Sequence, residues 1–549
     1  MTSGAAARVQ GGAMQSYARG PTGTIVRKTI AEAFLETANR FAERIALISR
    51  HQNIRLTWAE YAHQAQRVAA GLRALGLHSG DRVGVWATSC AEWPILQFGC
   101  ALAGVVPVNV NPANRSHELS FVLRKSRMRA LLLQTLDKRS NYKSILEESR
   151  AGQTLALEHV IYLDSVQWEN FLCEPDGITV NPDPDEPANI QYTSGTTGQS
   201  KGVLLTHVNL VNNARFFADY MRLTEQDRVC VPVPLFHCFG SVIGTMTAAV
   251  CGAACIFPAA TFDPLATLEA IDTERATVIY GVPAMFIAEL QHPEFGRFQL
   301  NSLRTGIMAG APCPIEIMRR VTDTMHCRHM LVVYGQTEAS PGITSSHVDD
   351  DLETRCTTVG CALPETEVRI VSPTGETLPA GEQGELLARG YMVMKGYDDE
   401  PEATAQAVDA DGWLHTGDLA LMRPDGYFKI TGRARDMIIR GGENVYPREI
   451  EEFLYTHPAI ADAQVVGLPD ERLGEIVVAW IRLKAGQTAD EEGIRTFCRE
   501  RLAYYKIPEH IRFVESYPMT LSGKVQKFKM REFEIAARGL EAVADRQTA

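Results

Sequence analysis

The sequence lacks the cysteine and histidine spacing of a zinc site. Its 12 cysteines are scattered, the closest pair is Cys251 and Cys255, and no CxxC pair occurs. Structural zinc needs four converging Cys or His ligands, so this spacing argues against it. Most of the cysteines, Cys100 and Cys230 among them, stand in apolar surroundings, which favours buried free thiols in a reducing compartment. We therefore expect a cytoplasmic protein.

An excess of basic residues is also missing. The chain has 54 Lys and Arg against 66 Asp and Glu, a formal net charge of −12. Nucleic-acid phosphates repel such a protein on average, so we expect no nucleic acid as a partner. Ordinary apolar and charged contents indicate a globular protein, and 549 residues suggest about two to four structural units.

Acidic residues are absent from the first 24 residues, which are rich in Ala, Gly and Arg. This composition fits a flexible tail and also a cleavable organelle-targeting segment, but it lacks the apolar core of a secretory signal. We expect flexible tails over 1–24 and 541–549.

No Asp, Glu, Lys or Arg occurs from Val229 to Phe262. The length would permit a membrane-spanning helix. Several prolines and glycines, with His237 among them, instead indicate strand, loop, buried helix and a second strand, so we expect no transmembrane span. Such an apolar wall also suits an acyl chain.

Helical patterns alternate with short apolar strands along the first part of the chain. Helical stretches lie within 29–75 and at 91–102, and strand patterns at 105–110. This alternation predicts a layered α/β domain with a parallel sheet. Shorter alternating strands over 357–390 predict a β-rich subdomain, and the last hundred or so residues predict a small α+β domain.

A run of hydroxyls and glycines, YTSGTTGQSKG, spans 192–202 between two strand patterns. Glycines let backbone N–H groups converge on an anion, and Lys201 adds a mobile positive charge suited to a polyphosphate. A solvent-exposed turn has a similar composition. The loop is not a Walker A loop, because Gly202 follows Lys201. The other glycines are Gly195 and Gly198, and the hydroxyl donors are Thr193, Ser194, Thr196 and Thr197.

This loop resembles the phosphate-binding signature of the adenylate-forming superfamily, which includes acyl-CoA synthetases, luciferases and nonribosomal adenylation domains. One departure is Ser200, where the family usually has proline. Further motifs follow in the family's order, and the resemblance extends from about residue 25 to 535. It is closest to medium-chain fatty acyl-CoA synthetases of the family member 2 type. These motifs are PLFHCFG, GIMAGAP, LVVYGQTE, GWLHTGDL, GRARDMIIRGGENVYP and PMTLSGKVQK.

The resemblance implies a site for ATP and Mg²⁺. Its catalytic residues are Lys201, Thr337, Glu338 and Lys524, of which Glu338 is the magnesium ligand, as expected of a hard oxygen donor. Thr337 contacts the α-phosphate, and Lys524 bridges the substrate carboxylate and that phosphate. The residues expected around the nucleotide are Thr193, Ser194, Gly195, Thr196, Thr197, Gly198, Lys201, Gly310, Ala311, Pro312, Tyr334, Thr337, Asp418, Arg433 and Lys524.

Within this set, Gly310 to Pro312 and Tyr334 enclose the adenine, and Asp418 and Arg433 hold the ribose. A turn aspartate that caps its own backbone is the alternative for Asp418. The alternative for Lys524 is a solvent-exposed lysine on a glycine turn with no functional role.

The resemblance further implies acyl and coenzyme A sites. It places His237 at the mouth of the acyl pocket, although a lone histidine in an apolar run also fits a core residue. Relatives that activate amino acids use an aspartate near this motif to pair the substrate ammonium. No acid occurs from Val231 to Thr245, so we expect an acid with an uncharged tail. The acyl and CoA residues are His237, Phe239, Met308, Gly310, Gly441 and Gly442.

We place the main domain boundary in GRARDMIIRGGENVYP. The ATP- and acyl-binding domain spans 25–432, a hinge spans 433–436 with Arg435 at its pivot, and a mobile lid domain spans 437–540. Relatives usually carry Asp or Lys at the pivot.

The implied reaction is ATP-dependent activation of a carboxylic acid, expected to be a medium-chain fatty acid, followed by transfer to CoA. Alternatives are an aryl-CoA ligase and an enzyme that loads a carrier protein. A nucleotide-binding regulatory protein without catalysis is a different class, which intact Lys201, Glu338, Asp418 and Lys524 disfavour. A homodimer is compatible with the sequence.

Overall fold

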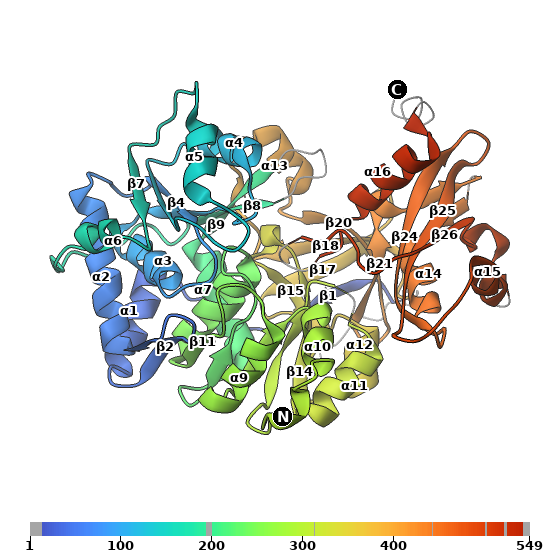
Figure 1. Cartoon of the computed structure of the whole chain (residues 1–549), viewed down its shortest axis with the longest axis horizontal. Coiled ribbons are helices and arrows are strands. Elements are labelled where there is room, and N and C mark those ends of the chain that lie inside the picture. Colours follow the sequence, from blue (N-terminus) through green and yellow to red (C-terminus); the bar gives the residue numbers. More distant parts are fainter. Residues whose placement is uncertain are drawn as a thin grey trace. The chain divides into compact units, whose positions relative to one another are not determined.

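The structure is a computed structural model that describes residues 14–193, 200–311, 313–441, 443–499, 502–520 and 524–541. The chain forms two compact units, whose elements are labelled in Figure 1. The larger unit contains residues 18–368 and 387–415. The smaller unit contains residues 369–386 and 416–541, with residues 14–17.

A seven-stranded sheet of the larger unit carries the predicted phosphate loop. It is parallel from β8 through β5, β4 and β6 to β7, whereas β9 and β19 extend it in antiparallel fashion. The chain therefore turns back at the carboxyl end of β8. In sheet order the strands are β19 (Gly396–Tyr397), β9 (Lys201–Thr206), β8 (Pro187–Thr193), β5 (Val106–Asn109), β4 (Arg82–Trp86), β6 (Ala130–Leu133) and β7 (His159–Tyr162).

A nine-stranded sheet forms the second layer of strands in the larger unit. It is parallel from β14 to β2 and antiparallel at both ends. In sheet order its strands are β16 (Cys361–Ala362), β15 (Gly342–Ser345), β14 (His329–Gly335), β13 (Thr305–Ala309), β12 (Val278–Gly281), β10 (Arg228–Cys230), β11 (Ala254–Phe257), β2 (Ile45–Ser49) and β3 (Ile54–Thr57).

One apolar core joins the facing sides of these two sheets with a layer of helices. Phe34 and Phe98 stack there with ring centroids 4.2 Å apart. Three helices of this layer begin at capping boxes, which fix where they start: Thr29 with Glu32, Thr57 with Glu60 and Thr206 with Asn209. The helices of this layer are α1 (Ile30–Arg40), α2 (Trp58–Ala74), α3 (Glu92–Ala103), α7 (His207–Tyr220), the π-helix η1 (Phe239–Met246) and α8 (Thr247–Cys251).

Helices also cover the outer faces of both sheets, as Figure 1 shows for α9 to α11 beside β14. Outside the seven-stranded sheet lie α4 (Ser116–Ser126) and α5 (Tyr142–Arg150), and α6 (Val166–Phe171) follows β7. The nine-stranded sheet is covered by α9 (Pro264–Glu274), α10 (Pro283–Leu290) and α11 (Ile315–Thr324). Shorter elements of this unit are η2 (Phe295–Arg297), η3 (Thr337–Ala339), α12 (Leu352–Thr357) and α13 (Pro401–Ala407).

A five-stranded sheet follows the order β1, β17, β18, β20, β21. Residues 17–19 thus form a paired strand, within the stretch 1–24 where the sequence predicted a flexible tail. The last two strands of this sheet form a hairpin that turns at Asp425-Gly426, a residue pair typical of such turns. The strands are β1 (Tyr17–Arg19), β17 (Thr366–Val371), β18 (Gly384–Gly390), β20 (Leu414–Met422) and β21 (Phe428–Arg433).

The carboxyl-terminal part of the smaller unit is α+β, as predicted. Helices cover both faces of its sheet, and Trp480 packs with Met530 on one of them. Its strands are β22 (Ile438–Arg440), β23 (Glu443–Val445), β24 (Ile460–Asp470), β25 (Gly474–Leu483) and β26 (His510–Phe513). Its helices are η4 (Ala434–Asp436), α14 (Pro447–Leu454), α15 (Glu491–Arg499), η5 (Tyr504–Lys506) and α16 (Lys527–Arg538).

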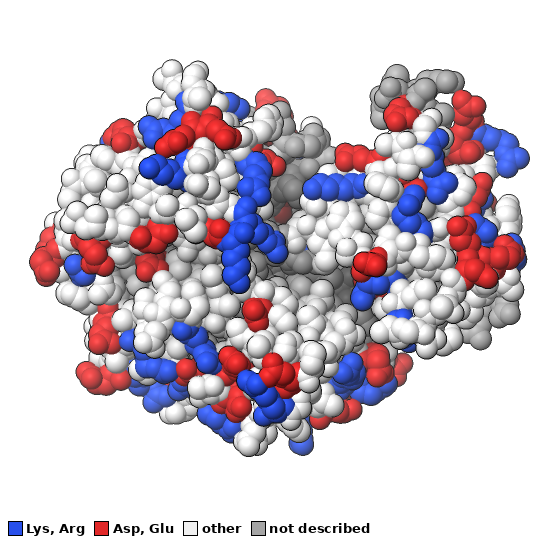
Figure 2. Space-filling model, viewed as in Figure 1, with Lys and Arg blue, Asp and Glu red and all other residues white. Residues whose placement is uncertain are grey.

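The uncharged stretch 229–262 folds as expected into strand, loop, buried helix and strand, although its first helical part is a π-helix. Within the described part of the chain, no helix has both the length and the apolar character needed to cross a membrane. Acidic and basic side chains are interspersed over the face of the molecule seen in Figure 2.

Candidate active site

The predicted phosphate loop joins two paired strands. Thr193 ends β8 and faces Lys201, the first residue of β9, across the antiparallel ladder. This pairing sets Lys201 at the carboxyl edge of the parallel strands, where α/β sheets bind ligands. The predicted residues between them, Ser194, Gly195, Thr196, Thr197 and Gly198, lie outside the described residues.

Lys201 and Glu338 both contact Tyr397. The Lys201 ammonium lies 4.8 Å from the centroid of the Tyr397 ring. On the other side, the Tyr397 hydroxyl donates a hydrogen bond of 2.9 Å to Glu338 Oε1. Burial, and next the Glu338 carboxylate, raises the pKa of Tyr397 well above its ordinary value, so the phenol remains a donor. The structure thus brings the two predicted site residues Lys201 and Glu338 to Tyr397, a residue that the sequence did not indicate.

Glu338 is placed by the turn from β14 into η3. At Gly335 a Cβ atom would lie 1.8 Å from the carbonyl oxygen of Pro341, so only glycine fits there. The Glu338 carbonyl accepts a hydrogen bond of 2.9 Å from the Met394 amide, and Ser340 Oγ donates one of 2.6 Å to the Met392 carbonyl. The segment before Tyr397 therefore fixes η3 as well.

Thr337 turns into the interior beside the PLFHCFG motif. It is buried, and its Oγ1 lies 3.9 Å from Cys238 Sγ. His237 Nδ1 accepts a hydrogen bond of 3.1 Å from the Phe239 amide. Phe239 begins η1, with its ring centroid 5.9 Å from that of Tyr280. The predicted α-phosphate residue thus adjoins the motif predicted to open the acyl pocket.

The predicted adenine residues follow neighbouring parallel strands. Gly310 and Ala311 come directly after β13, and Tyr334 lies in β14, which pairs with β13. Gly310 and Ala311 are exposed and Tyr334 is half-buried, so these residues form one accessible edge. Pro312 lies outside the described residues. Met308 is fully buried in the core that includes residues of α9 to α11.

In the smaller unit, the two predicted ribose residues contact each other. Asp418 of β20 and Arg433 of β21 are strand partners, and Arg433 Nε lies 2.9 Å from Asp418 Oδ1. The Asp418 side chain is 5% exposed and that of Arg433 is 46% exposed. The Asp418 amide bonds to Thr416 Oγ1 at 3.1 Å, which helps to hold the strand end. A buried carboxylate is thereby oriented by an accessible guanidinium.

The other predicted residues of the smaller unit lie in turns. Gly441 links β22 and β23 with φ of +59°, and its amide bonds to the Leu473 carbonyl at 2.7 Å. The turn before α16 closes through Thr520, whose Oγ1 accepts from the Lys524 amide at 3.0 Å. The Arg435 backbone lies in η4. Gly442 and the Arg435 side chain lie outside the described residues.

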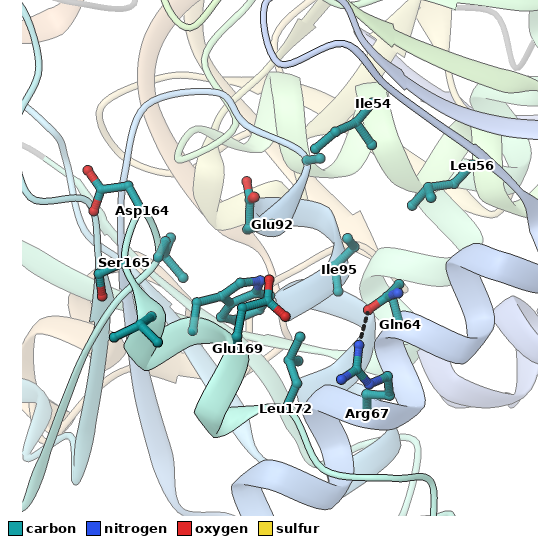
Figure 3. Close-up of a pocket in the computed structure, with 14 residues that line it drawn as sticks. Ile54, Leu56, Gln64, Arg67, Glu92, Ile95, Asp164, Ser165, Glu169 and Leu172 are labelled. Atoms are coloured by element: carbon teal, nitrogen blue, oxygen red, sulfur yellow. Dashed lines mark hydrogen bonds between the residues drawn. The ribbon is translucent and has the colours of Figure 1, made fainter.

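A surface groove of about 650 Å³ lies elsewhere in the larger unit, lined by α2, α3 and α6 (Figure 3). Its floor includes Ile95 and Leu172, with the charged residues Arg67, Glu92 and Glu169 around them. None of the predicted site residues lines this groove, so its size alone does not mark the active site.

Comparison with known proteins identifies the family. The sequence matches the AMP-binding enzyme family over residues 34–398 and the AMP-binding enzyme C-terminal domain over residues 449–524. The chain belongs to the AMP-binding enzyme family.

Among its relatives, Bacillus subtilis acyl-CoA synthetase YngI is 45% identical over 92% of this chain and 97% of that protein. Zebrafish (Danio rerio) medium-chain acyl-CoA ligase ACSF2, mitochondrial, is 42% identical over 92% of this chain and 88% of that protein. ATP-bound MatB from Rhodopseudomonas palustris has a TM-score of 0.83 at 30% identity, covering 92% of this chain and 98% of MatB.

These findings confirm the resemblance read from the motifs, the mixed α/β fold and the prediction of an AMP-forming acyl-CoA synthetase that uses ATP and CoA. The roles of individual residues in this AMP-binding enzyme stay predictions.

Tyr397 is the residue that sequence reasoning missed. It lies in the segment YMVMKGYDDE, where a Gly-Tyr pair gives no chemical signal by itself. Its importance follows from the pairing of β19 with β9, which sets Tyr397 opposite Val203, two residues beyond Lys201. Only that long-range register brings the phenol between the lysine and the glutamate.

Proposed function

We propose that this AMP-binding enzyme activates a medium-chain fatty acid with ATP and transfers the acyl group to coenzyme A. The observation that carries the proposal is that Lys201 and Glu338 both contact Tyr397. An ammonium for phosphate and a carboxylate for a metal ion suit a bound polyphosphate. The medium-chain preference is supported by the ACSF2 relative at 42% identity.

In the first half-reaction, a carboxylate oxygen of the fatty acid attacks the α-phosphorus of ATP. The new P–O bond gives the acyl-adenylate, and the bond to the β-phosphate breaks to release pyrophosphate. Lys201 stabilises the charge that builds on the leaving phosphates, and the buried Thr337 hydroxyl donates to the α-phosphate. Lys524 aligns the carboxylate with that phosphate, and no protein nucleophile is needed.

Magnesium fits the donor set around Glu338. Its Oε1 accepts from Tyr397, which leaves Oε2 for a cation. Among the described residues, no group of three or more His, Cys, Asp or Glu side chains could hold a metal. A magnesium ion at this carboxylate would offset the negative charge of the bound phosphates. Glu338 would hold it.

An uncharged acyl tail is supported by the character of the π-helix region. Every residue of η1 is buried, and no Asp, Glu, Lys or Arg occurs from Val229 to Phe262. A buried ammonium or a second carboxylate would be left unpaired among these side chains. His237 and Phe239 begin this wall, and we place the tail beyond them, with Gly310 as a further acyl residue. The predicted acyl residue Met308 packs instead with α9 to α11, in a different core from Phe239. An aliphatic tail fits this chemistry, and an aryl acid is the alternative.

In the second half-reaction, the CoA thiolate attacks the acyl carbon and AMP leaves. For this step we propose that the domain 437–540 turns about the hinge 433–436, with Arg435 as its pivot. Lys524 then leaves the reacting carboxylate, and Gly441 and Gly442 line the path of pantetheine. Arg435→Pro should slow thioester formation more than adenylate formation, which separate half-reaction assays would measure.

A cytoplasmic location and a homodimer complete the proposal. All 12 cysteines are free thiols, which suits a reducing compartment. Fractionation of the source cells would test the location, and recovery in an organelle or after cleavage near residue 20 would overturn it. Light scattering would test the homodimer, and a monomer mass would contradict it.

The test of the proposed function is product analysis. With ATP, Mg²⁺, CoA and octanoate, the enzyme should form octanoyl-CoA, AMP and pyrophosphate in equal amounts. Free CoA left unreacted while a carrier protein is acylated would point to the carrier-loading alternative. No pyrophosphate release with any acid would overturn the proposal in favour of a regulatory nucleotide-binding protein.

A further inference from the structure

Tyr397 contacts two groups of opposite charge. Its ring faces the Lys201 ammonium at 4.8 Å, and its hydroxyl bonds to Glu338 Oε1 at 2.9 Å. In the described part of the chain, Lys201 and Glu338 each contact Tyr397 and form no ion pair with each other. A direct ion pair would leave neither the Lys201 ammonium available to phosphate nor the Glu338 carboxylate available to a metal ion. The phenol, which is neutral, holds both without neutralising either.

The backbone of Tyr397 is fixed on several sides. Strand β19 pairs with β9, and the Tyr397 amide donates to Thr404 Oγ1 at 2.9 Å. The next residue, Asp398, donates its amide to the Gly202 carbonyl at 2.8 Å, so the residue after Lys201 is held too. Asp398 is 2% exposed and forms two bonds of 2.7 Å to Arg82. The phenol is therefore presented by a rigid segment rather than by a mobile loop.

We propose that Tyr397 is a positioning residue that keeps the Lys201 ammonium and the Glu338 carboxylate apart, so that both remain available to a metal-bound nucleoside triphosphate. This rests on the nucleotide site assigned under the proposed function. Tyr397 acts through its two neighbours and takes no part in bond making.

Two substitutions separate its two contacts. Tyr397→Phe removes the bond to Glu338 and keeps the ring beside Lys201. Tyr397→Leu removes both contacts and leaves Lys201 able to pair with Glu338. Tyr162→Phe is the matched control, because Tyr162 is a half-buried tyrosine of β7 outside the predicted site.

The primary measurement is calorimetric ATP binding, with Mg²⁺ and in excess EDTA. In EDTA, we expect Tyr397→Phe to bind ATP as tightly as the wild type. Mg²⁺ raises the affinity of the wild type for ATP, and we expect this increase to be about tenfold smaller in the variant. Equal weakening with and without Mg²⁺ would mark a merely structural role and overturn the proposal. Unchanged binding under both conditions would overturn it as well.

A second variant tests the separation of charges. In EDTA, Tyr397→Leu should bind ATP about tenfold more weakly than wild type, because Lys201 pairs with Glu338. Adding Glu338→Gln to it should restore that affinity, since the partner charge is gone. Failure of the double variant to recover, with thermal unfolding unchanged, would contradict the proposal. These binding results are independent of the acyl substrate, so they stand or fall separately from the medium-chain assignment.

Discussion

Arg82 and Asp398 form a bidentate ion pair across 316 positions of the chain, with both N–O distances at 2.7 Å. Asp398 is almost fully buried, and it directly follows Tyr397. The pair therefore ties β4 to β19 and holds the segment that touches Lys201 and Glu338. Long-range pairing of this kind lets a segment far along the chain contribute to the predicted nucleotide site.

Asp398→Ala should destabilise the larger unit by about 3–5 kcal/mol, because it leaves the Arg82 guanidinium without its buried partner. Urea unfolding followed by tryptophan fluorescence would measure the change. The matched control is Asp399→Ala, which breaks an exposed pair with Arg127 and should cost less than about 1 kcal/mol. If the two substitutions lower the free energy of unfolding equally, then the Arg82–Asp398 pair stabilises the unit no more than the exposed pair does.

Gly335→Ala should abolish most adenylate formation, with a loss of about a hundredfold or more in kcat. The added Cβ would lie 1.8 Å from the Pro341 carbonyl oxygen, so the turn that carries Thr337 and Glu338 must shift. Pyrophosphate release measures this step. Gly296→Ala is the control, since its Cβ would meet no atom within 4 Å. Normal activity of Gly335→Ala would rule out a fixed position for the Thr337–Glu338 turn.

Asp418→Asn should weaken ATP binding by about ten- to a hundredfold, the loss expected for charge-assisted hydrogen bonds to the ribose hydroxyls. Calorimetry with ATP measures it directly. Asp425→Asn serves as the control, because that aspartate pairs with Arg423 in the turn of the same hairpin. If Asp418→Asn binds ATP as wild type does, then Asp418 serves only to hold Arg433.

Stability should fall as the pH drops from about 6.5 to 4. His207 is buried, and its Nδ1 accepts a hydrogen bond of 3.1 Å from the Ile30 amide at the start of α1. Burial lowers the pKa of His207 to about 4, an effect that Glu32 partly offsets. Between these pH values the unfolded chain binds a proton that the folded chain does not, so folding loses up to about 3 kcal/mol.

Urea unfolding of His207→Gln at several pH values checks this prediction. The variant should lose less stability over that interval than the wild type, whereas substitution of the exposed His63 by Gln should follow the wild type. Parallel curves for His207→Gln and the wild type would refute the assignment.

The sequence predicted most of the fold because local signals and tertiary structure agree. Helices begin directly after Thr29 and Thr57, within the helical stretch predicted over 29–75, and Asp425-Gly426, a pair typical of tight turns, lies at a hairpin. What the sequence did not indicate depends on distant partners. The π-helix η1 has no distinct local pattern, and the pairing of β19 with β9 joins segments nearly 200 residues apart.

The candidate site divides in the same way. Lys201, Thr337, Glu338, Asp418 and Arg433 were predicted through motifs whose residues carry charge or hydroxyl groups. The structure brings Asp418 to Arg433 and sets Lys201 and Glu338 about Tyr397. Tyr397 and Asp398 were not predicted, because a Tyr-Asp dipeptide occurs in many structural contexts and does not by itself indicate a functional site. Their function becomes visible only when Gly202 and Arg82 are found beside Asp398.

Lys524→Ala should reduce adenylate formation by about a hundredfold or more while leaving thioester formation from supplied acyl-AMP and CoA intact. In the proposed mechanism, its charge serves the reacting carboxylate only in the first half-reaction. Lys529→Ala is the control, an exposed lysine of α16 beside Phe528. Equal loss of both half-reactions would contradict this division of labour.

The most direct test of the central claim is the specificity constant, kcat/KM, for saturated fatty acids from C4 to C16 and for aryl acids, with ATP, Mg²⁺ and CoA. Medium-chain acids should give the highest values, with acyl-CoA and AMP formed in equal amounts. A maximum at aryl acids or at the longest chains, or AMP formation without acyl-CoA, would contradict the assignment.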